Sequence, residues 1–330
     1  MSTQQLLFRL IADGQIHSGR DLAAQLGVSR TAVWKQLKGL QSLGVVCDAI
    51  PGKGYQIGKK VELLERDEIM GGLRHDVLET LDLLEVLWNL PSTNDYLLDA
   101  KAPDIGKARV CVAEYQSGGR GRRGRKWQSP LGSGVYMSLS WQFAEVPRDF
   151  AALGLVAGIG VTRALARTGV TETVLKWPND VLLQNGKLAG ILVEVRGEPD
   201  GPMHAVIGTG VNCIVSREMR DSVVSEGGLH PVGLFDEIPA AEISRNELAA
   251  AILEEIALAV RVFERDGFMP FSEEWKSRDA LLGREVNVQM GNATISGAVQ
   301  GLTDDGRLSL RTANGIQNLS AGEVSLRSVP

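Results

Sequence analysis

The stretch AEYQSGGRGRRGRKW (113–127) restricts the fold of this chain more than any other, because it places a glycine-rich loop between two apolar segments. Its GRGRRG core (119–124) matches the G-x-G-x-x-G spacing of a dinucleotide-binding turn, and residues 108–115 before it read as a strand. Such a turn requires a helix that starts among the glycines and points its N-terminus at a pyrophosphate. Here a second strand, GVYMSLSW (134–141), follows after RKWQSPLGSG. This context excludes a Rossmann turn, and the chain has no G-x-x-x-x-G-K-S/T phosphate loop.

The same loop is strongly cationic. Its glycines allow backbone amides to approach an anion closely, and arginine binds phosphate or carboxylate through two parallel N–H groups. A long loop of this kind between two strands is expected to be mobile when empty. The pattern therefore predicts an anion-binding loop, with a merely solvated basic loop as the alternative. Its cations are Arg120, Arg122, Arg123, Arg125 and Lys126.

Composition and cysteine spacing exclude several classes of protein. With 330 residues, 44% hydrophobic and 23% charged, the chain is long enough for two or three soluble domains. Its N-terminus lacks the pattern of a signal peptide, and the apolar segment 150–169 is interrupted by arginines and is too short for a bilayer span. The three cysteines and four histidines are scattered, so neither disulfides nor a protein-ligated metal is expected. We expect a cytoplasmic protein with no membrane partner.

The first sixty residues predict a small DNA-binding module. They carry eight Lys or Arg and three Asp or Glu, a net charge of +5; because the whole chain carries −5, residues 61–330 carry −10. Ser18 and Ser29 are placed to begin two short helices separated by Gly27, which is helix-turn-helix spacing, and VVCDAIPGKGYQI then predicts a β-wing. A helical interaction domain that does not touch DNA is the alternative. The residues left for DNA contacts are Ser29, Arg30, Thr31, Trp34, Lys35 and Lys38 on the second helix and Lys53 on the wing.

A second cluster of polar residues lies in VLKWPNDVLLQNGKLAGILVEV (174–195). Pro-Asn-Asp turns between two strand-like segments, and Asn-Gly predicts a hairpin. Lys187 opens the otherwise apolar return strand, so its ammonium points either into a pocket or out to water. An edge-blocking lysine is the structural alternative, and Lys176 fits a surface lysine equally well. Residues 204–212 then read as a buried strand that ends in glycines and Asn212.

Upstream, Ser92-Thr93-Asn94 lies between a strand and a helix. By local physics these residues form a helix cap. They are also placed to present hydroxyls and an amide to a ligand at the end of the strand.

Five motifs now stand in order at ordinary spacing: PSTND, AEYQSGGRGRRGRKWQSP, KWPND, GKLAGILVE and GTGVN. Together they resemble the biotin–protein ligases, and the N-terminal module resembles the bifunctional bacterial members that also repress the biotin operon. The resemblance covers essentially the whole chain. It implies an α/β (α+β) multidomain protein with a winged helix-turn-helix over 1–62, a central mixed-sheet ligase domain of the class II synthetase/biotin ligase type over 63–275, and an SH3-like β-barrel over 276–330. The barrel strands would be REVNVQM, ATISGAVQGL, GRLSLRT and GEVSLRS.

The resemblance implies a two-step reaction. Biotin's carboxylate would attack the α-phosphate of ATP, and the biotinyl-5′-AMP formed would be attacked by a lysine of a biotin carboxyl carrier protein. Fixed positive charge and Mg²⁺ serve the first step, which needs no covalent enzyme nucleophile. The chain fits this need, because it has cationic motifs but no G-x-S-x-G and no Cys/His pair.

The resemblance also implies roles for particular residues. The catalytic group would be Lys187, Arg122, Arg120 and Lys176. Biotin's ring and carboxylate would be held by Ser92, Thr93, Asn94 and Gln116. Arg120, Gly121 and Arg122 would close over the carboxylate and the α-phosphate, and Asn179, Asp180 and Asn212 are candidates for the nucleotide or its metal, which arrives with ATP rather than in a protein cage.

One departure from the family stands in 222–238, where bacterial members close a second loop on the adenine with a tryptophan. This segment has none, and Leu229, Leu234 or Phe235 are the possible substitutes. The implied partners are the carrier protein of acetyl-CoA carboxylase, operator DNA of biotin biosynthesis genes, and a second copy of the chain when the adenylate is bound. Two other functions fit local physics: a regulator that only senses biotin or a nucleotide, and an acyl ligase for lipoate or another carboxylate.

Overall fold

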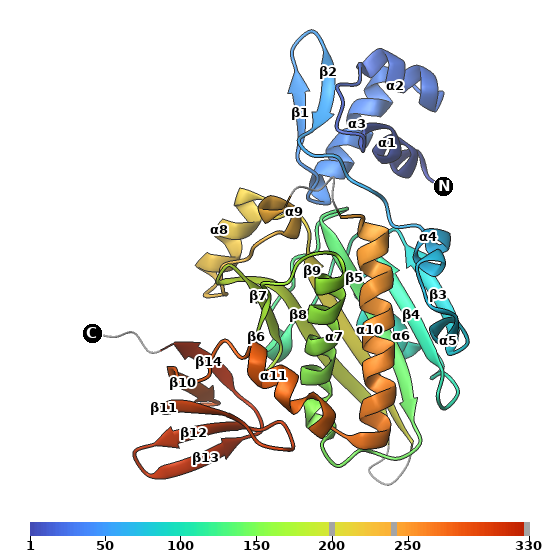
Figure 1. The fold of residues 1–330 in the computed structure, drawn as a ribbon. Coiled ribbons are helices and arrows are strands. Elements are labelled where there is room, and N and C mark those ends of the chain that lie inside the picture. Colours follow the sequence, from blue (N-terminus) through green and yellow to red (C-terminus); the bar gives the residue numbers. More distant parts are fainter. Residues whose placement is uncertain (198–201, 239–242, 327–330) are drawn as a thin grey trace.

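The computed structural model describes residues 1–197, 202–238 and 243–326. Three parts follow one another along the chain (Figure 1): an N-terminal helical part with a two-stranded wing, a central sheet with helices on both faces, and a C-terminal antiparallel sheet.

The N-terminal part is a winged helix-turn-helix, as the sequence predicts. Ser18 and Ser29 cap its second and third helices with their side chains, and Gly27 ends the second helix in the left-handed conformation that favours glycine. The preceding helix, which the sequence analysis missed, begins with a capping box between Ser2 and Gln5. The elements are α1 (Thr3–Ile11), α2 (Gly19–Leu26), α3 (Arg30–Ser42), β1 (Cys47–Ile50) and β2 (Gly54–Ile57).

The central part is built on a seven-stranded mixed sheet with the order β3-β4-β5-β9-β8-β7-β6. Only β3 and β4 pair in parallel, because a helix connects them, and the other neighbours are antiparallel. The Asn-Gly turn joins β7 to β8 as predicted, with both Gln184 and Asn185 at positive φ. The strands are β3 (Leu81–Leu87), β4 (Ala108–Ala113), β5 (Gly134–Phe143), β6 (Val174–Lys176), β7 (Asp180–Leu183), β8 (Gly186–Gly197) and β9 (Met203–Asn212).

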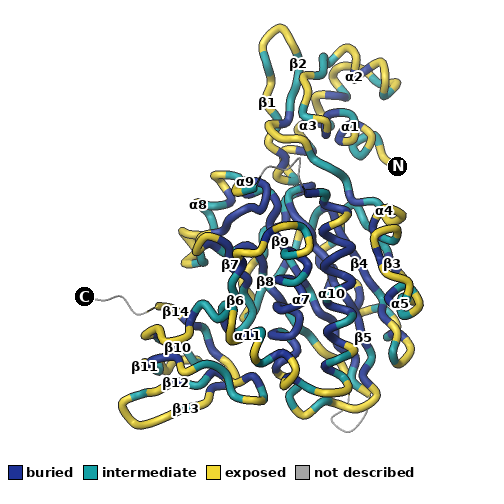
Figure 2. The backbone as a smooth tube through the Cα atoms, in the orientation of Figure 1, coloured by how far each residue is buried: buried dark blue, intermediate teal, exposed yellow. Residues whose placement is uncertain are grey.

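One face of this sheet is covered by two long helices, α7 (Leu153–Arg167) and α10 (Arg245–Asp266), whose sheet-facing sides are buried (Figures 1 and 2). The prediction that the apolar segment 150–169, which contains α7, is too short to span a bilayer was wrong. By length and composition alone, Phe150–Arg167 is a segment that could cross a membrane. Two-thirds of it is nevertheless buried in this protein, against α10 and the sheet, so it is a core helix here.

The opposite face carries the polar residues. Along β5, Leu139 and Trp141 belong to the main core, whereas the alternating Ser138 and Ser140 face the other way, as a strand requires. That side is partly covered by α6 (Thr93–Asp99) and by the arginine-rich loop. The shorter elements of the central part are α4 (Arg66–Gly71), α5 (His75–Leu78), η1 (Arg122–Gly124), η2 (Phe150–Ala152), α8 (Arg217–Ser225) and α9 (Leu234–Glu237).

The C-terminal part follows η4 (Met269–Phe271) and α11 (Ser272–Arg278). It is a five-stranded antiparallel sheet, one strand more than predicted, and its closure into an SH3-like barrel stays a prediction. The order is β13-β12-β11-β10-β14, and residues 327–328 of the last predicted strand lie outside the described residues. The strands are β10 (Glu285–Met290), β11 (Ala293–Leu302), β12 (Leu308–Thr312), β13 (Gly315–Leu319) and β14 (Glu323–Leu326).

The winged helix packs directly on the central part. The ring of Phe8 meets that of Trp88 edge to face with centroids 5.7 Å apart, and Leu131 belongs to the winged-helix core. Beneath this contact, the guanidinium of Arg245 pairs with Glu114 at 2.9 Å, and both side chains are almost fully buried. Glu114 also accepts from the amide of Leu64, in the segment that links the two parts. The winged helix is therefore joined to the central part through packed, buried side chains and not only by a flexible linker.

Candidate active site

A cavity of about 820 Å³ lies on the polar face of the sheet, under the arginine-rich loop. It is lined by strand ends β6 to β9, by the start of α6, and by residues of the C-terminal sheet. The structure brings together every ligand or catalytic residue that the sequence analysis singled out. These are Ser92, Thr93, Asn94, Gln116, Arg120, Gly121, Arg122, Lys176, Asn179, Asp180, Lys187 and Asn212.

A polar network closes one end of the cavity. Gln116 accepts from the hydroxyl of Thr93 at 3.1 Å and from its amide at 2.9 Å, and it donates to Ser129 at 2.9 Å. Ser138, buried on β5, lies 2.7 Å from the Thr93 hydroxyl and 2.6 Å from Oδ1 of Asn94. Ser92 caps α6 and is itself buried, so this end presents fixed donors and acceptors with their geometry set by secondary structure.

Glycines form the floor of the cavity. Gly190 on β8 and Gly210 on β9 are cross-strand partners, and the indole of Trp127 lies over both. A Cβ at Gly210 would lie 2.4 Å from Nε1 of Trp127, and one at Gly208 would lie 2.3 Å from Oδ1 of Asn94. Side chains at these positions would fill the space that the strands leave open. Gly208 and Gly210 of GTGVN therefore make room for the side chains of Asn94 and Trp127, and only glycine fits there.

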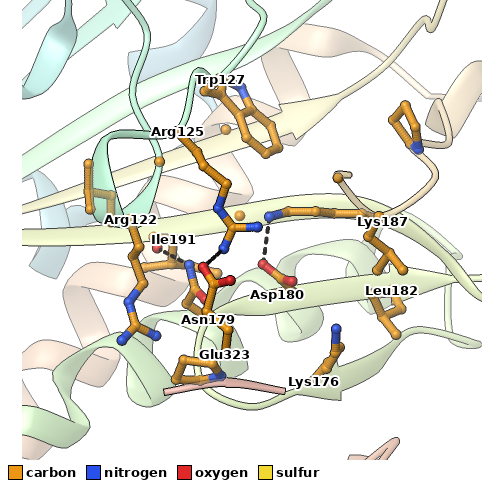
Figure 3. Close-up of a pocket in the computed structure, with 18 of the residues that line it drawn as sticks. Arg122, Arg125, Trp127, Lys176, Asn179, Asp180, Leu182, Lys187, Ile191 and Glu323 are labelled. Atoms are coloured by element: carbon orange, nitrogen blue, oxygen red, sulfur yellow. Dashed lines mark hydrogen bonds and ion pairs between the residues drawn. The ribbon is translucent and has the colours of Figure 1, made fainter. Parts of the chain in front are cut away.

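Lys187 points into the cavity and not to water. Its ammonium lies 2.6 Å from a carboxylate oxygen of Asp180 and 5.3 Å from the ring centroid of Trp127 (Figure 3). Lys176 lies on β6, on the other side of β7 from Lys187. Burial lowers the pKa of its ammonium, with Asp180 opposing that shift and Lys187 adding to it. Two lysines and one carboxylate thus share this corner, an arrangement suited to an added anion.

The arginine-rich loop is a short hairpin across the cavity. Trp127 donates to the carbonyl of Gly119 at 2.9 Å, and Gly121 donates to that of Arg125 at 2.7 Å. At the tip, burial lowers the pKa of the Arg122 guanidinium, and the like charge of Arg123 lowers it further. Arg125 forms an ion pair with Glu323 of the C-terminal sheet (Figure 3).

Arg120 differs from Arg122 in its surroundings. It pairs with both oxygens of Asp95 on α6, and it also contacts both oxygens of Glu194 on β8 at 3.1 Å. The side chain of Asn94 donates to the same Glu194 at 2.7 Å.

The two candidate asparagines have structural partners. Asn179 donates to the carbonyl of Ile191 at 2.9 Å (Figure 3), and Asn212 donates to that of Lys187 at 3.3 Å. Both side chains therefore fix the strand ends that carry the lysines, and each keeps its amide oxygen for a ligand.

The segment 222–238 borders the far end of the cavity. Of the three suggested substitutes for the missing tryptophan, Leu234 and Phe235 are buried in the main core, and only Leu229 lines the cavity. Met219 and Val223 of α8 add further apolar surface there. The structure thus removes Leu234 and Phe235 as candidates.

The sequence analysis missed two residues that line the cavity, Trp127 and Glu323. It also missed Asp95, Ser138 and Glu194, which do not line the cavity but hydrogen-bond to residues that do. No histidine or cysteine lines the cavity in the described part of the chain. Across residues 1–197, 202–238 and 243–326, no group of three or more His, Cys, Asp or Glu could hold a metal ion. The lining described here is therefore equipped for binding anions and stabilising charge.

The predicted DNA-contact residues form an exposed surface on α3 and the wing. Ser29 caps α3 through its hydroxyl, and the ammonium of Lys38 lies 5.9 Å from the ring centroid of Trp34, which is half exposed. All seven residues are exposed: Ser29, Arg30, Thr31, Trp34, Lys35, Lys38 and Lys53.

Three protein families match the chain by sequence. Residues 3–56 match the HTH domain, residues 87–212 match the Biotin/lipoate A/B protein ligase family, and residues 281–327 match the Biotin protein ligase C terminal domain.

The chain is also similar to individual proteins along nearly its full length. It is 37% identical over 324 residues to the bifunctional ligase/repressor BirA of Escherichia coli, which covers 98% of this chain and 96% of that protein. It is 33% identical over 249 residues to the biotin–acetyl-CoA-carboxylase ligase of Mycobacterium tuberculosis, covering 73% and 88% of the two chains. Among solved structures, the biotin protein ligase from Aquifex aeolicus in complex with biotin and ATP matches with a TM-score of 0.61 and 30% identity, over 75% of this chain and all of that one.

Proposed function

The chain belongs to the biotin protein ligase family and matches its bifunctional ligase/repressor members along nearly its whole length. On this basis we propose which of its residues serve each of the two activities. It activates biotin with ATP to biotinyl-5′-AMP and transfers biotin to a lysine of a biotin carboxyl carrier protein. Its helix-turn-helix domain makes it a repressor as well.

The first step joins two anions. A carboxylate oxygen of biotin attacks the α-phosphorus of ATP, the new acyl–phosphate bond forms, and the bond to the β-phosphate breaks to release pyrophosphate. Negative charge gathers on the phosphoryl oxygens, so the site must supply fixed positive charge rather than a nucleophile. The cations at the cavity meet this need.

Lys187 and Arg122 carry this role. Lys187 enters from the strand that forms the cavity floor, and Arg122 stands at the loop tip, half-buried and beside another arginine. An anion that binds there gains attraction without first displacing a tight ion pair from Arg122. Lys176 supports Lys187 from β6, two strands away.

Biotin occupies the end of the cavity closed by the polar network. The ureido ring lies against Ser92, Thr93, Asn94 and Gln116, where fixed hydroxyls and amides match its N–H and C=O groups. The ring system packs against the indole of Trp127, which covers Gly190 and Gly210, and the backbone of Arg120 and Gly121 lies over the carboxylate.

ATP occupies the end nearer Lys176 and the C-terminal sheet. Asn179, Asp180 and Asn212 border its phosphates, and Leu229 covers the base in place of the missing tryptophan. The carboxylate of Asp180 is a hard oxygen donor and fits one coordination position of Mg²⁺, which neutralises phosphate charge when it is bound.

In the second step, a carrier lysine in its neutral form attacks the acyl carbon of the adenylate. The amide bond forms, AMP leaves, and the proton of the amine passes to solvent. The carrier protein of acetyl-CoA carboxylase is the expected acceptor, because related chains are biotin–acetyl-CoA-carboxylase ligases.

Repression uses the exposed surface of α3 and the wing. A dimer formed when the adenylate is bound would place two recognition helices on twofold-related half-sites. The junction core between the winged helix and the catalytic part supports transmission of ligand binding to DNA binding. This arrangement requires a cytoplasmic protein, where carrier and operator are both present. Sedimentation velocity with and without biotinyl-AMP tests the dimer, and a monomer under both conditions would remove it.

The observation that carries the ligase assignment is the gathering of all twelve predicted residues around one cavity. The decisive experiment measures pyrophosphate release by the purified protein with Mg·ATP, with and without biotin. A biotin-dependent burst near one per active site followed by slow turnover supports it. Lipoate and other acids serve as competitors, and no release with any acid would leave only a DNA-binding sensor.

A further inference from the structure

One arginine of the loop is already neutralised. The Arg120 guanidinium lies between the carboxylates of Asp95 and Glu194, so the local sum is one positive and two negative charges. The hydrogen bond that the guanidinium donates to Asp95 raises the pKa of Arg120, which keeps the guanidinium charged and paired. A group in this state exerts little net attraction on a substrate anion, since its field is cancelled at close range.

The three partners come from three separate elements. Arg120 lies on the loop hairpin, Asp95 in the first turn of α6, and Glu194 on β8. Only Arg120 belongs to the segment that covers the cavity, whereas α6 and β8 are parts of the rigid sheet layer. The contact therefore attaches the loop hairpin to α6 and β8.

This contact continues into the polar end of the cavity. Glu194 accepts from the side chain of Asn94 at 2.7 Å, whose oxygen lies 2.6 Å from Ser138, which in turn contacts Thr93. One chain of hydrogen bonds thus runs from the loop hairpin to the residues that would hold the ligand ring. A ligand that orders Thr93 and Asn94 also orders the position of Arg120.

We propose that Arg120, Asp95 and Glu194 form a clamp that positions the arginine-rich loop, and that the Arg120 side chain is a positioning residue rather than a charge-stabilising one. The clamp sets the height of the hairpin above the cavity, so that Arg122 and the backbone of Gly121 reach the reacting oxygens. This inference rests on the proposed ligase function. It assigns different roles to Arg120 and Arg122, which the loop sequence alone does not distinguish.

A comparison of variants by burst kinetics tests the clamp. The double variant Asp95→Asn/Glu194→Gln removes both carboxylates and leaves Arg120 in place. If Arg120 only positions the loop, this variant raises the KM for biotin and speeds escape of the adenylate by about tenfold, while the rate of pyrophosphate release at saturating biotin changes less than threefold. Arg120→Ala gives the same pattern, and combining it with the double variant adds little, because the clamp is already open.

The opposite pattern overturns the proposal. If Arg120 stabilises charge directly, Arg120→Ala lowers the saturated rate by about 10²-fold, the carboxylate variants keep or raise that rate, and the effects add. The matched control is Asp82→Asn, which breaks the ion pair with Arg109 on the far strands of the same sheet and should change neither parameter.

A second readout needs no turnover. Trypsin cleaves exposed arginine loops, so limited proteolysis of the unliganded full-length chain reports how firmly the hairpin is held. Cleavage within 120–126 should be about tenfold faster in Asp95→Asn/Glu194→Gln than in Asp82→Asn. Equal rates refute the clamp even if the wild-type protein releases pyrophosphate normally. If the wild type releases none, the ligase assignment fails, and the proteolysis result still decides the clamp.

Discussion

Replacement of Lys187 by alanine is the sharpest test of how this cavity accelerates adenylation. The ammonium reaches the cavity with only a quarter of its side chain exposed and lies 2.6 Å from Asp180, so it contacts a bound anion at close range. At an effective dielectric constant of about 20, a unit charge about 4 Å away contributes about 4 kcal/mol. The ammonium attracts the bound anion in the ground state as well as in the transition state, and it gives up its contact with Asp180 to do so. Only part of this contribution of about 4 kcal/mol therefore lowers the barrier. We therefore expect a loss of about 3 kcal/mol, or about 10²-fold in the rate of the first step.

The assay is the single-turnover formation of biotinyl-AMP, followed by pyrophosphate release at saturating biotin and Mg·ATP. Lys176→Ala should lose about tenfold, because its ammonium is two strands farther along the sheet and acts by supporting Lys187. Lys107→Ala is the matched control, since that lysine binds the carbonyl of Glu79 on the surface. Wild-type folding of each variant is checked by its thermal transition.

Two results would refute this reasoning. An enzyme with Lys187→Ala that adenylates within about threefold of wild type would show that the ammonium is not near the developing charge. A loss that appears only in the KM for biotin, with the saturated rate unchanged, would show that Lys187 binds ground state and transition state equally.

Three further outcomes follow from the same contacts. Gly210→Ala places a Cβ 2.4 Å from Nε1 of Trp127, so calorimetry should show biotin affinity reduced about tenfold, whereas Gly154→Ala, with its nearest neighbour 3.8 Å away, should bind normally. Arg245→Met leaves the carboxylate of Glu114 buried without its partner, so urea unfolding should show stability lower by about 3–5 kcal/mol; a loss below about 1 kcal/mol would contradict a buried pair. Burial lowers the pKa of His204 below its ordinary value, so the unfolded chain takes up the proton first and stability falls as pH drops through about 6.5; urea midpoints at pH 7.5 and 5.5 should differ less in His204→Gln.

Much of the cavity could be predicted because its residues stand beside strong local signals. The Asn-Gly turn, the Ser92 cap and the glycines of 208–212 each fix a strand end or a helix start from a few neighbouring residues. Those ends belong to strands of one sheet, and α6 folds back over β5 and β9, so the residues attached to them meet in space. The family resemblance then supplied the roles expected of these residues.

The partners of the cations could not be predicted in the same way. Glu194 is 74 residues from Arg120 along the chain, and nothing in the local sequence says which carboxylate a given arginine will meet. The missed strand β13 has a different cause. Four of its five residues are exposed or only half-buried, so it lacks the alternation that marks a strand against a core. The choice among Leu229, Leu234 and Phe235 also required tertiary packing, because all three are apolar and only burial distinguishes them.

The resting cavity carries its own anions, and this explains how one site can be strongly cationic yet remain folded without a ligand. Lys187 is paired with Asp180, Arg120 with Asp95 and Glu194, and Arg125 with Glu323. When a polyanion binds, its phosphates replace carboxylates as partners of the cations. The free-energy cost of removing each cation from water has already been incurred during folding, so binding does not incur it again. An exchange of this kind would release Asp180 when ATP binds with a divalent cation, and the Asp180 carboxylate would then be one of the residues able to hold that cation. The clamp at Arg120 does not take part in the exchange, because it faces α6 and β8. Its pairing persists, and the hairpin keeps its place over the cavity with Arg122 at its tip.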